Sequence, residues 1–189
     1  MCWDRSGVLV TEAFDYKANP GILIEFVWRF IRATQAQQGF DLTAAPVDSE
    51  KDRDSFLTAI RSHVQLQLAL DPMTDEEEFD REVAKHCYQG AVARLTIGNY
   101  DIWVSRPLWL SRAIVGRCTA GYWGVRCDTK AVVFVKDVWH TNVKNVEPKG
   151  DILKDLQEKG VGYIPTVLCH RDVLNDEGLN VSLITRFFF

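Results

Sequence analysis

Apolar positions recur with helical spacing in the first 90 residues of this chain and with strand spacing after them. The run from Val8 to Phe14 predicts a short strand. Asn19 followed by Pro20 predicts a helix start, because a capping side chain and a proline at the first helical position both favour one. Apolar residues then recur every three or four positions up to Gly39, which predicts an amphipathic helix of about 18 residues that needs no membrane to explain it. These apolar residues are Ile22, Leu23, Phe26, Val27, Phe30 and Ile31.

Two further helices are predicted before residue 90. Residues 41–54 are polar and contain Pro46, so we expect a loop there. The next apolar stripe has helical spacing and predicts a second helix. Thr74 with Glu77 resembles a capping box and predicts the start of a third helix. The two stripes are Phe56, Leu57, Ile60 and Val64, and then Phe79, Val83 and Cys87.

From residue 91 onward, short runs rich in β-branched and aromatic residues alternate with turn residues, which predicts an antiparallel meander. One short helix, Pro148–Lys159, and two more strands, Thr166–Cys169 and Val181–Thr185, are predicted after it. The predicted fold class is therefore α+β, an antiparallel sheet with one crossing helix, preceded by a mostly helical region. We place the domain boundary at residue 90, between 1–90 and 91–189. The meander strands are Ala91–Ile97, Tyr100–Ser105, Leu108–Val115, Tyr122–Arg126 and Ala131–Val135.

Composition excludes several classes of protein. The chain has 189 residues, of which 47% are apolar, enough for a sizeable core. Its five cysteines are an odd number without a CxxC pair, which disfavours a disulfide scaffold or a zinc ribbon and favours the reducing cell interior. No apolar run reaches the roughly 18 residues of a membrane helix, and the first residues do not resemble a secretory signal. We therefore expect an intracellular protein of the cytoplasm or nucleus, not secreted and without a membrane partner.

Charge argues against a nucleic-acid partner. The net charge is −4, and residues 41–90 carry 12 acidic and 5 basic side chains. The acidic run from Asp75 to Glu82 is explained by a solvated first helical turn. A nucleic-acid binder needs a basic stripe to neutralise phosphates, and none is visible.

Candidate chemistry begins at a glycine-rich segment. The phosphate-binding pattern GxGxxGxV is matched at Gly116 and Gly121, but it is broken by Cys118 and by Trp123 at the valine position. Such a pattern lets backbone N–H groups approach phosphate oxygens, which a side chain at Cys118 obstructs. A hairpin turn that needs a positive φ explains the glycines equally well.

A lysine after an apolar strand is the second candidate. Lys136 follows Val132–Val135, and a lysine so placed can contact nucleotide phosphates in surroundings of low dielectric constant. A lysine at a strand end also commonly extends its ammonium into water. Taken alone, the spacing favours this second interpretation.

Several segments together resemble the fungal-type protein kinase domain, a divergent branch of the protein-kinase-like fold. Gly116–Thr119 with Trp123 is similar to the family's G-R-x-T-x-x-W turn. Phe134–Trp139 is similar to its V-x-K-D-x-W strand, and this match favours Lys136 as the phosphate-contacting lysine. The other matching segments are Asp151–Val161 with Ile164-Pro165, Trp3–Gly7 and Gly39–Asp41.

The resemblance implies a kinase-like small lobe, with a five-stranded antiparallel sheet and a helix between its third and fourth strands. It implies ATP with Mg²⁺ as cofactor and phosphorylation of protein serine or threonine as the family's activity. Lys136 would contact the phosphates, with Gly116 and Gly121 nearby, and a carboxylate of the following helix would pair with the lysine. The candidate carboxylates are Glu147, Asp151 and Asp155, of which Asp151 fits the family's spacing better.

One apparent motif is rejected. His170-Arg171-Asp172 spells the catalytic-loop triplet of kinases, but Glu177 stands where that loop needs an asparagine. We interpret the triplet as the turn leaving the fourth strand, and we assign no catalytic residue and no metal ligand. With no Asp-Phe-Gly segment and no large lobe, we expect this chain alone to be catalytically silent.

A non-enzymatic alternative remains open. A kinase small lobe can serve as a protein-interaction module, and Phe187–Phe189 would then be an exposed apolar end that associates with a partner through the C-terminal edge. The pairs His86-Cys87 and Cys169-His170 lack the ligand spacing of zinc sites, so we predict ordinary packing for them.

Overall fold

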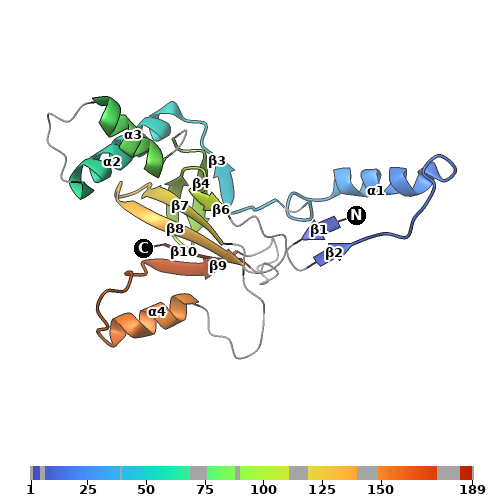
Figure 1. The fold of residues 1–189 in the computed structure, drawn as a ribbon. Coiled ribbons are helices and arrows are strands. Elements are labelled where there is room, and N and C mark those ends of the chain that lie inside the picture. The colour runs from blue at the N-terminus through green and yellow to red at the C-terminus, as the bar shows by residue number, and fades with distance from the viewer. Residues whose placement is uncertain are drawn as a thin grey trace.

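The computed structural model describes residues 2–4, 7–38, 40–68, 76–87, 90–110, 119–139, 149–173 and 184–188. Two short strands, β1 (Cys2–Asp4) and β2 (Gly7–Leu9), form a hairpin, and α1 (Pro20–Arg32) follows. Figure 1 shows α1 beside this hairpin and away from the main sheet. None of the described helices is both long enough and apolar enough to cross a membrane.

The main sheet has eight strands, and all of their pairings are antiparallel. Seven of them follow the order β3-β4-β5-β7-β8-β10-β9. The eighth strand, β6, pairs with β7 on the same side as β5. The helix α4 (Lys149–Glu158) lies in the chain between β8 and β9. The strands are β3 (Ala44–Pro46), β4 (Ala93–Ile97), β5 (Tyr100–Val104), β6 (Trp109–Leu110), β7 (Thr119–Arg126), β8 (Val132–Trp139), β9 (Cys169–Asp172) and β10 (Ile184–Phe188).

Within this sheet, β6, β7, β8, β10 and β9 form the predicted five-stranded unit, with α4 between its third and fourth strands in the chain. The predicted α+β class is therefore confirmed. The sheet continues beyond β7 with β5 and β4, which the meander prediction included, and with β3, which lies in the segment 41–54 where we expected a loop. Since β3 comes from the N-terminal region, that region contributes a strand as well as helices. The domain boundary at residue 90 stays a prediction.

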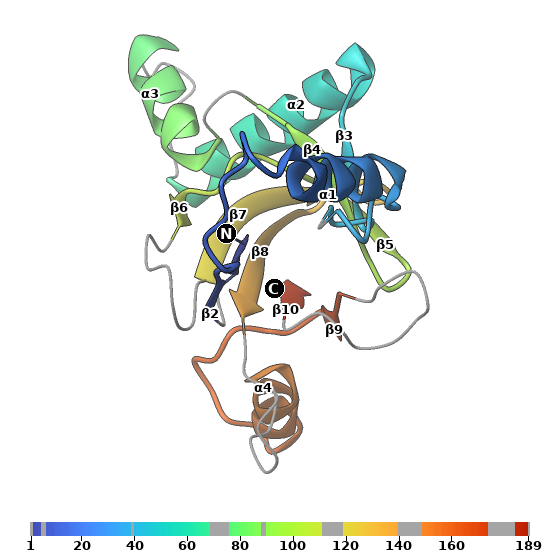
Figure 2. The same cartoon turned by 90° about the vertical axis from the view of Figure 1, so that its right-hand side faces the viewer.

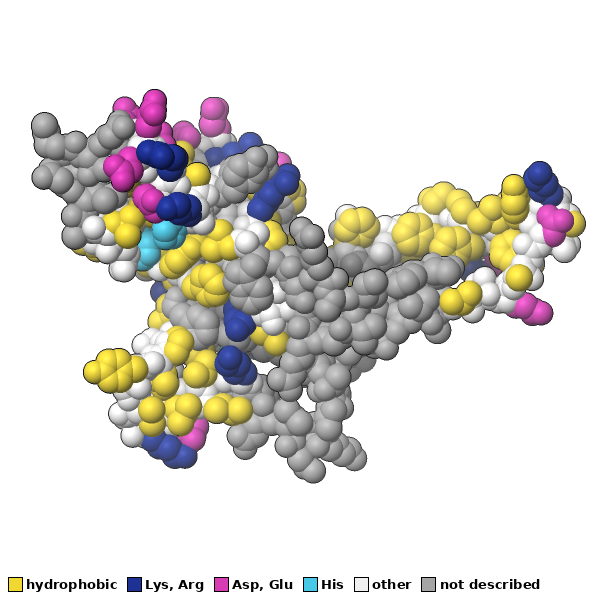
Figure 3. All heavy atoms as spheres, viewed as in Figure 1, with side chains coloured by type: hydrophobic (Ala, Val, Ile, Leu, Met, Phe, Trp, Pro, Cys, Tyr) yellow, Lys and Arg dark blue, Asp and Glu magenta, His cyan; other side chains and the backbone are white. Residues whose placement is uncertain are grey.

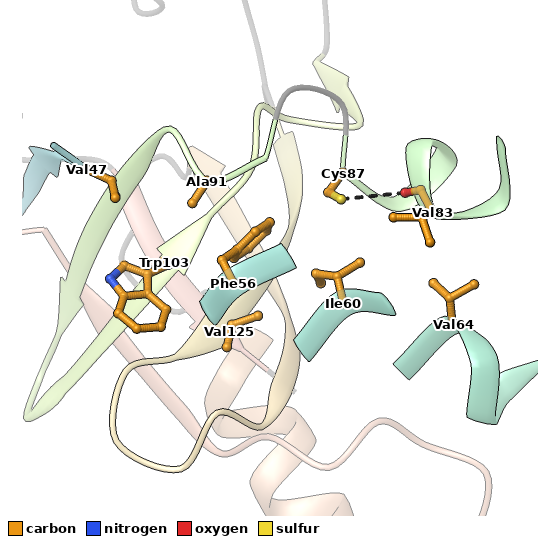
Figure 4. Close-up of a cluster of buried hydrophobic side chains, with 9 residues drawn as sticks. All are labelled: Val47, Phe56, Ile60, Val64, Val83, Cys87, Ala91, Trp103 and Val125. Carbon is orange, nitrogen blue, oxygen red and sulfur yellow. Dashed lines mark hydrogen bonds between the residues drawn. The ribbon is translucent and has the colours of Figure 1, made fainter. Parts of the chain in front are cut away.

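Two helices, α2 (Glu50–Gln67) and α3 (Glu76–His86), cover one face of the sheet, which we call the α2 face. Phe56, Ile60 and Val64 of α2 are completely buried, and Figure 4 shows them directed toward the same cluster as Trp103 and Val125 of the sheet. Burying each such side chain contributes about 1.5–3 kcal/mol. The Arg61–Asp80 ion pair joins α2 to α3. These contacts explain why α2 lies where it does, and both helices are as predicted in type.

The opposite face of the sheet has its own apolar cluster, because the sheet curls so that β9 approaches β4. Figure 2 shows this curvature, with α2 and α3 over the upper part of the sheet and α4 below it. Cys169 Sγ lies 3.9 Å from the carbonyl oxygen of Ile97 at the meeting point. The second cluster consists of Leu95, Ile97, Ile102, Val104, Val133 and Val135.

The first helix begins at Pro20 as predicted, but it ends at Arg32 and not near Gly39, because Ala33 already has extended backbone (ψ 148°). None of its residues is buried, so its apolar stripe has no partner among the described residues. Figure 3 shows these apolar side chains gathered along the helix. The exposed apolar residues of α1 are Ile22, Leu23, Ile24, Phe26, Val27, Trp28, Phe30 and Ile31.

The strand predicted at Thr166–Cys169 begins three residues later, at Cys169, whereas β10 overlaps the strand predicted at Val181–Thr185, whose first three residues lie outside the described part of the chain. The interpretation of His170–Asp172 as a turn is therefore wrong, since all three residues belong to β9 and pair with β10. Phe187 and Phe188 are also strand residues, and β10 lies between β8 and β9. The C-terminal strand is thus an inner strand, not an open edge of the sheet.

Candidate functional site

Lys136 lies near the middle of the α2 face. It stands on β8 directly opposite Gly121 of β7 on one side and Phe187 of β10 on the other. Residues paired in this way share a face of the sheet, so Gly121, which is buried, places no side chain beside the lysine. Asp137, next in the chain, lies on the opposite face, where the hydroxyl of Tyr122 donates to it at 3.5 Å.

Burial lowers the pKa of Lys136, and the positive charge of Lys149 lowers it further. Both effects disfavour the ammonium cation in its present surroundings. An anion bound beside Lys136 would relieve this cost, because opposite charges attract strongly where the dielectric constant is low. Lys136 is therefore a half-buried cation whose charge its surroundings disfavour.

An aromatic wall borders Lys136 along the strands. Two residues away on the same face, Phe134 of β8 lies opposite Trp123 of β7, and their rings meet edge to face at 5.5 Å. The imidazoles of His63 on α2 and His86 on α3 lie 5.4 Å and 5.3 Å from the Trp123 ring. Burial lowers the pKa of His63, and His86 lowers it further. This side of the lysine is thus filled by rings and covered by helices.

The first turn of α4 lies against β9, two strands from Lys136 in the order of the sheet. His170 of β9 lies opposite Phe187, which itself lies opposite Lys136, so these three positions form one row across the sheet. The Oδ1 atom of Asp151 lies 3.2 Å from Nε2 of His170. A Cβ on Gly150 would lie 2.3 Å from the His170 ring, so only glycine allows α4 to approach β9 this closely.

The structure brings together some of the predicted site residues. Gly121 and Lys136 are a direct cross-strand pair. Asp151 lies at the start of α4, as its proposed role requires, but the contact it makes is with His170. Asp155 forms an ion pair at 2.6 Å with Lys159, the residue that follows α4. The pairing of Lys136 with Asp151 stays a prediction. Gly116, Cys118 and Glu147 lie outside the described residues.

Sequence reasoning missed two features. It gave no partner for His63, which contacts Trp123. It also gave no role to Lys149, which lies at the start of α4 and acts electrostatically on Lys136. Neither residue belongs to a recognisable motif, so only the three-dimensional arrangement identifies them.

Two pockets lie elsewhere on the molecule. One of about 740 Å³ is a shallow surface along α2 that includes Lys51, Asp54 and Lys130. One of about 160 Å³ lies where β4 meets β9 and includes Gly98 and Arg171. Neither is lined by Lys136. Across the described part of the chain, no three His, Cys, Asp or Glu side chains gather closely enough to hold a metal ion.

Comparison with known proteins gave one match. The family model for the fungal protein kinase matches residues 1–185, nearly the whole chain. Neither the curated proteins nor the solved structures contain a match.

Proposed function

The chain belongs to the fungal protein kinase family, and from this premise we propose that its sheet binds the phosphates of ATP through Lys136. The observation that carries the proposal is the direct pairing of Gly121 with Lys136 on the α2 face. A glycine beside a half-buried cation adds no side chain at the place where the charge acts, as the approach of a phosphate group requires. Gly116 and Asp151 are proposed members of the same site.

The described residues fit the phosphates of the nucleotide better than its metal ion. Lys136 supplies the positive charge, while no carboxylate cluster that would hold Mg²⁺ is found among the described residues. When bound, ATP supplies the phosphoryl group that the family transfers to protein serine or threonine. We propose that this chain by itself binds the nucleotide without transferring that group. The incorporation of His170-Arg171-Asp172 into β9 supports this, because a strand triplet cannot serve as a catalytic loop.

ATP-induced thermal stabilisation tests the site. We expect ATP to raise the melting temperature of the 189-residue protein and Lys136→Ala to abolish this rise. Lys85→Ala is the matched control, because it removes the same charge from an exposed side chain of α3. An unchanged rise in melting temperature in Lys136→Ala would exclude this lysine from the site. Measurable phosphotransfer by the pure chain would contradict the proposal that the chain alone is catalytically inactive.

A protein-interaction module is the second candidate function, and the exposed apolar stripe of α1 favours it. A contiguous apolar surface of this kind commonly marks a binding site. Because β10 is paired on both sides, its hydrogen-bonding edges are occupied. The association predicted at the C-terminus would therefore use a face of this strand. Light scattering with and without ATP separates the functions. Association that does not depend on ATP and is lost in Phe26→Glu favours the protein-interaction module. A monomer that binds ATP favours the nucleotide site.

We also propose that the protein works inside the cell. Cys87, Cys127 and Cys169 are free thiols, which suits a reducing compartment. Localisation of the tagged chain by microscopy tests this directly, and a secreted product would contradict it.

A further inference from the structure

The helix α1 exposes more apolar surface than a single chain ordinarily does. None of its residues is buried, and its eight large apolar side chains are exposed by between 44% at Val27 and 71% at Ile31. A large apolar side chain that is half exposed presents roughly 100 Å², so the eight together present about 800 Å². The largest apolar patch on a typical monomer is about 300–600 Å², whereas each partner in a standard protein interface contributes about 800 Å².

Local hydrogen bonds fix both ends of α1. Before the helix, Oδ1 of Asp15 accepts the backbone N–H groups of Lys17 and Ala18 at 2.8 and 3.2 Å. After it, the side-chain amide of Gln38 donates to the carbonyl oxygen of Phe30 at 2.8 Å. Such contacts leave a helix of 13 residues only marginally stable in water, because helices of this length gain most of their stability by packing an apolar face. We therefore expect α1 to pack on a surface outside the described part of this chain.

The charged residues of α1 lie on the side opposite Val27. Successive residues of a helix turn by about 100°, so Glu25 and Arg29 each lie about 160° from Val27, and they form an ion pair with each other there. The side centred on Val27, which we call the Val27 face, is wholly apolar. The other members of this face, all within about 60° of Val27, are Leu23, Ile24, Phe30 and Ile31.

The Val27 face has the same pattern read in either direction along the helix. Leu23 and Ile31 stand four residues before and after Val27, and Ile24 and Phe30 stand three residues before and after it. Two copies of α1 that cross antiparallel at Val27 would therefore place Leu23 level with Ile31 and Ile24 level with Phe30, at both ends of the contact. Such a pair buries apolar side chains along its whole length and leaves the charges of both helices in water.

We propose that the chain forms a homodimer through α1, with the Val27 faces of two copies packed antiparallel. This inference rests on the protein-interaction module proposed above, and it names a second copy of the chain as the partner. The self-matching pattern of the face favours a second copy, because neither a membrane surface nor an unrelated protein requires that symmetry. Since α1 lies away from the main sheet (Figure 1), the contact leaves the sheet and its Lys136 unchanged.

Light scattering after size-exclusion chromatography tests the inference on the full 189-residue chain. The unmodified protein should have the mass of two copies at micromolar concentrations. Ile31→Glu should be a monomer, because it places a charge within the Val27 face. Ile22→Glu is the matched control, because it makes the same change at another exposed isoleucine of α1 that lies about 140° from Val27. It should remain a dimer.

Cysteine crosslinking tests the antiparallel arrangement. Oxidation of a mixture of Leu23→Cys and Ile31→Cys should join the two variants to each other faster than it joins two copies of Leu23→Cys, because only the mixed pair lies level. The unmodified chain, with its own cysteines, measures the background. Preferential joining of two Leu23→Cys copies would indicate parallel helices and overturn the proposed arrangement.

The remaining outcomes separate the inference from the interaction module. A monomeric unmodified chain would overturn the inference. If that monomer binds vesicles of phosphatidylcholine and phosphatidylserine through α1, the helix binds a membrane surface and the module is wrong as well. If Ile31→Glu and Ile22→Glu both remain dimers, the chain associates through another surface, so the inference is wrong while the module stands. If both become monomers, the contact is not centred on Val27 and the inference is again wrong. Circular dichroism confirms that each variant is folded.

Discussion

The carboxylate of Asp151 on α4 lies 3.2 Å from the imidazole of His170 on β9, and this contact joins the only helix that follows β8 among the described residues to the outer strand of the sheet. Sequence reasoning had considered the two residues separately, one as a partner for Lys136 and the other as part of a false catalytic triplet. Their contact gives both a structural role. It holds the first turn of α4 beside the row that contains Lys136.

Gly150→Ala should therefore destabilise the protein by about 1–3 kcal/mol, the usual cost of an added methyl group in a packed site. The new Cβ would lie 2.3 Å from the His170 ring, which would have to move and release Asp151. Urea unfolding followed by circular dichroism measures the change. Gly21→Ala is the control, since no atom lies within 4 Å of its added Cβ and alanine favours the helix. Equal stability of Gly150→Ala and the unmodified protein would show that α4 is not held at this point.

Phe56→Ala should be among the most damaging single changes. The Phe56 ring is completely buried between α2 and the sheet, so its removal leaves a cavity in the cluster of Figure 4. Substitutions of this kind typically cost about 3–5 kcal/mol. Leu57→Ala, at the exposed neighbouring position, should cost less than about 1 kcal/mol. Denaturant titration of the two variants compares them, and similar losses would mean that α2 does not pack on the sheet through Phe56.

Strongly periodic segments were predicted well, and polar strands were not. The stripe containing Phe56 and Ile60 identified α2, because every fourth position had to be buried. The start of β9 was placed too early, because His170, Arg171 and Asp172 lack the apolar alternation of a buried strand. These polar residues are tolerated in β9 because it is the outermost strand of the sheet and pairs on one side with β10.

The candidate site was predictable only in part. Lys136 and Gly121 each carry a signal, but their pairing depends on the register of β7 with β8, which no motif specifies. The position of Asp151 depends on the fit of Gly150 against His170, a contact between distant parts of the sequence. The aromatic wall depends equally on α3, whose His86 reaches Trp123 only after α2 and α3 have packed on the sheet.

The described cysteines should react slowly with alkylating reagents in the folded protein. Burial raises the pKa of Cys127 to about 11, with Asp101 adding to the effect, and burial also raises the pKa of Cys87. The thiolate is the reactive form, so little of it exists near pH 8. Iodoacetamide labelling followed by mass spectrometry should modify both residues much faster in urea than in buffer. Equal rates in the two conditions would mean that these thiols are not protected by the fold.

His63 should make the protein less stable in mild acid. Its pKa in the folded state is lowered from 6.5, first by burial and then by His86, so the unfolded chain takes up a proton more readily than the folded one. The stabilisation is complete above pH 6.5 and is lost as the pH falls from there through the lowered pKa. His63→Gln cannot be protonated, so it should lose less stability than the unmodified protein between about pH 7.5 and pH 5.5. Unfolding free energies at the two pH values give the comparison. If both proteins lose the same amount, the imidazole beside Trp123 does not resist protonation, and other groups cause the acid sensitivity.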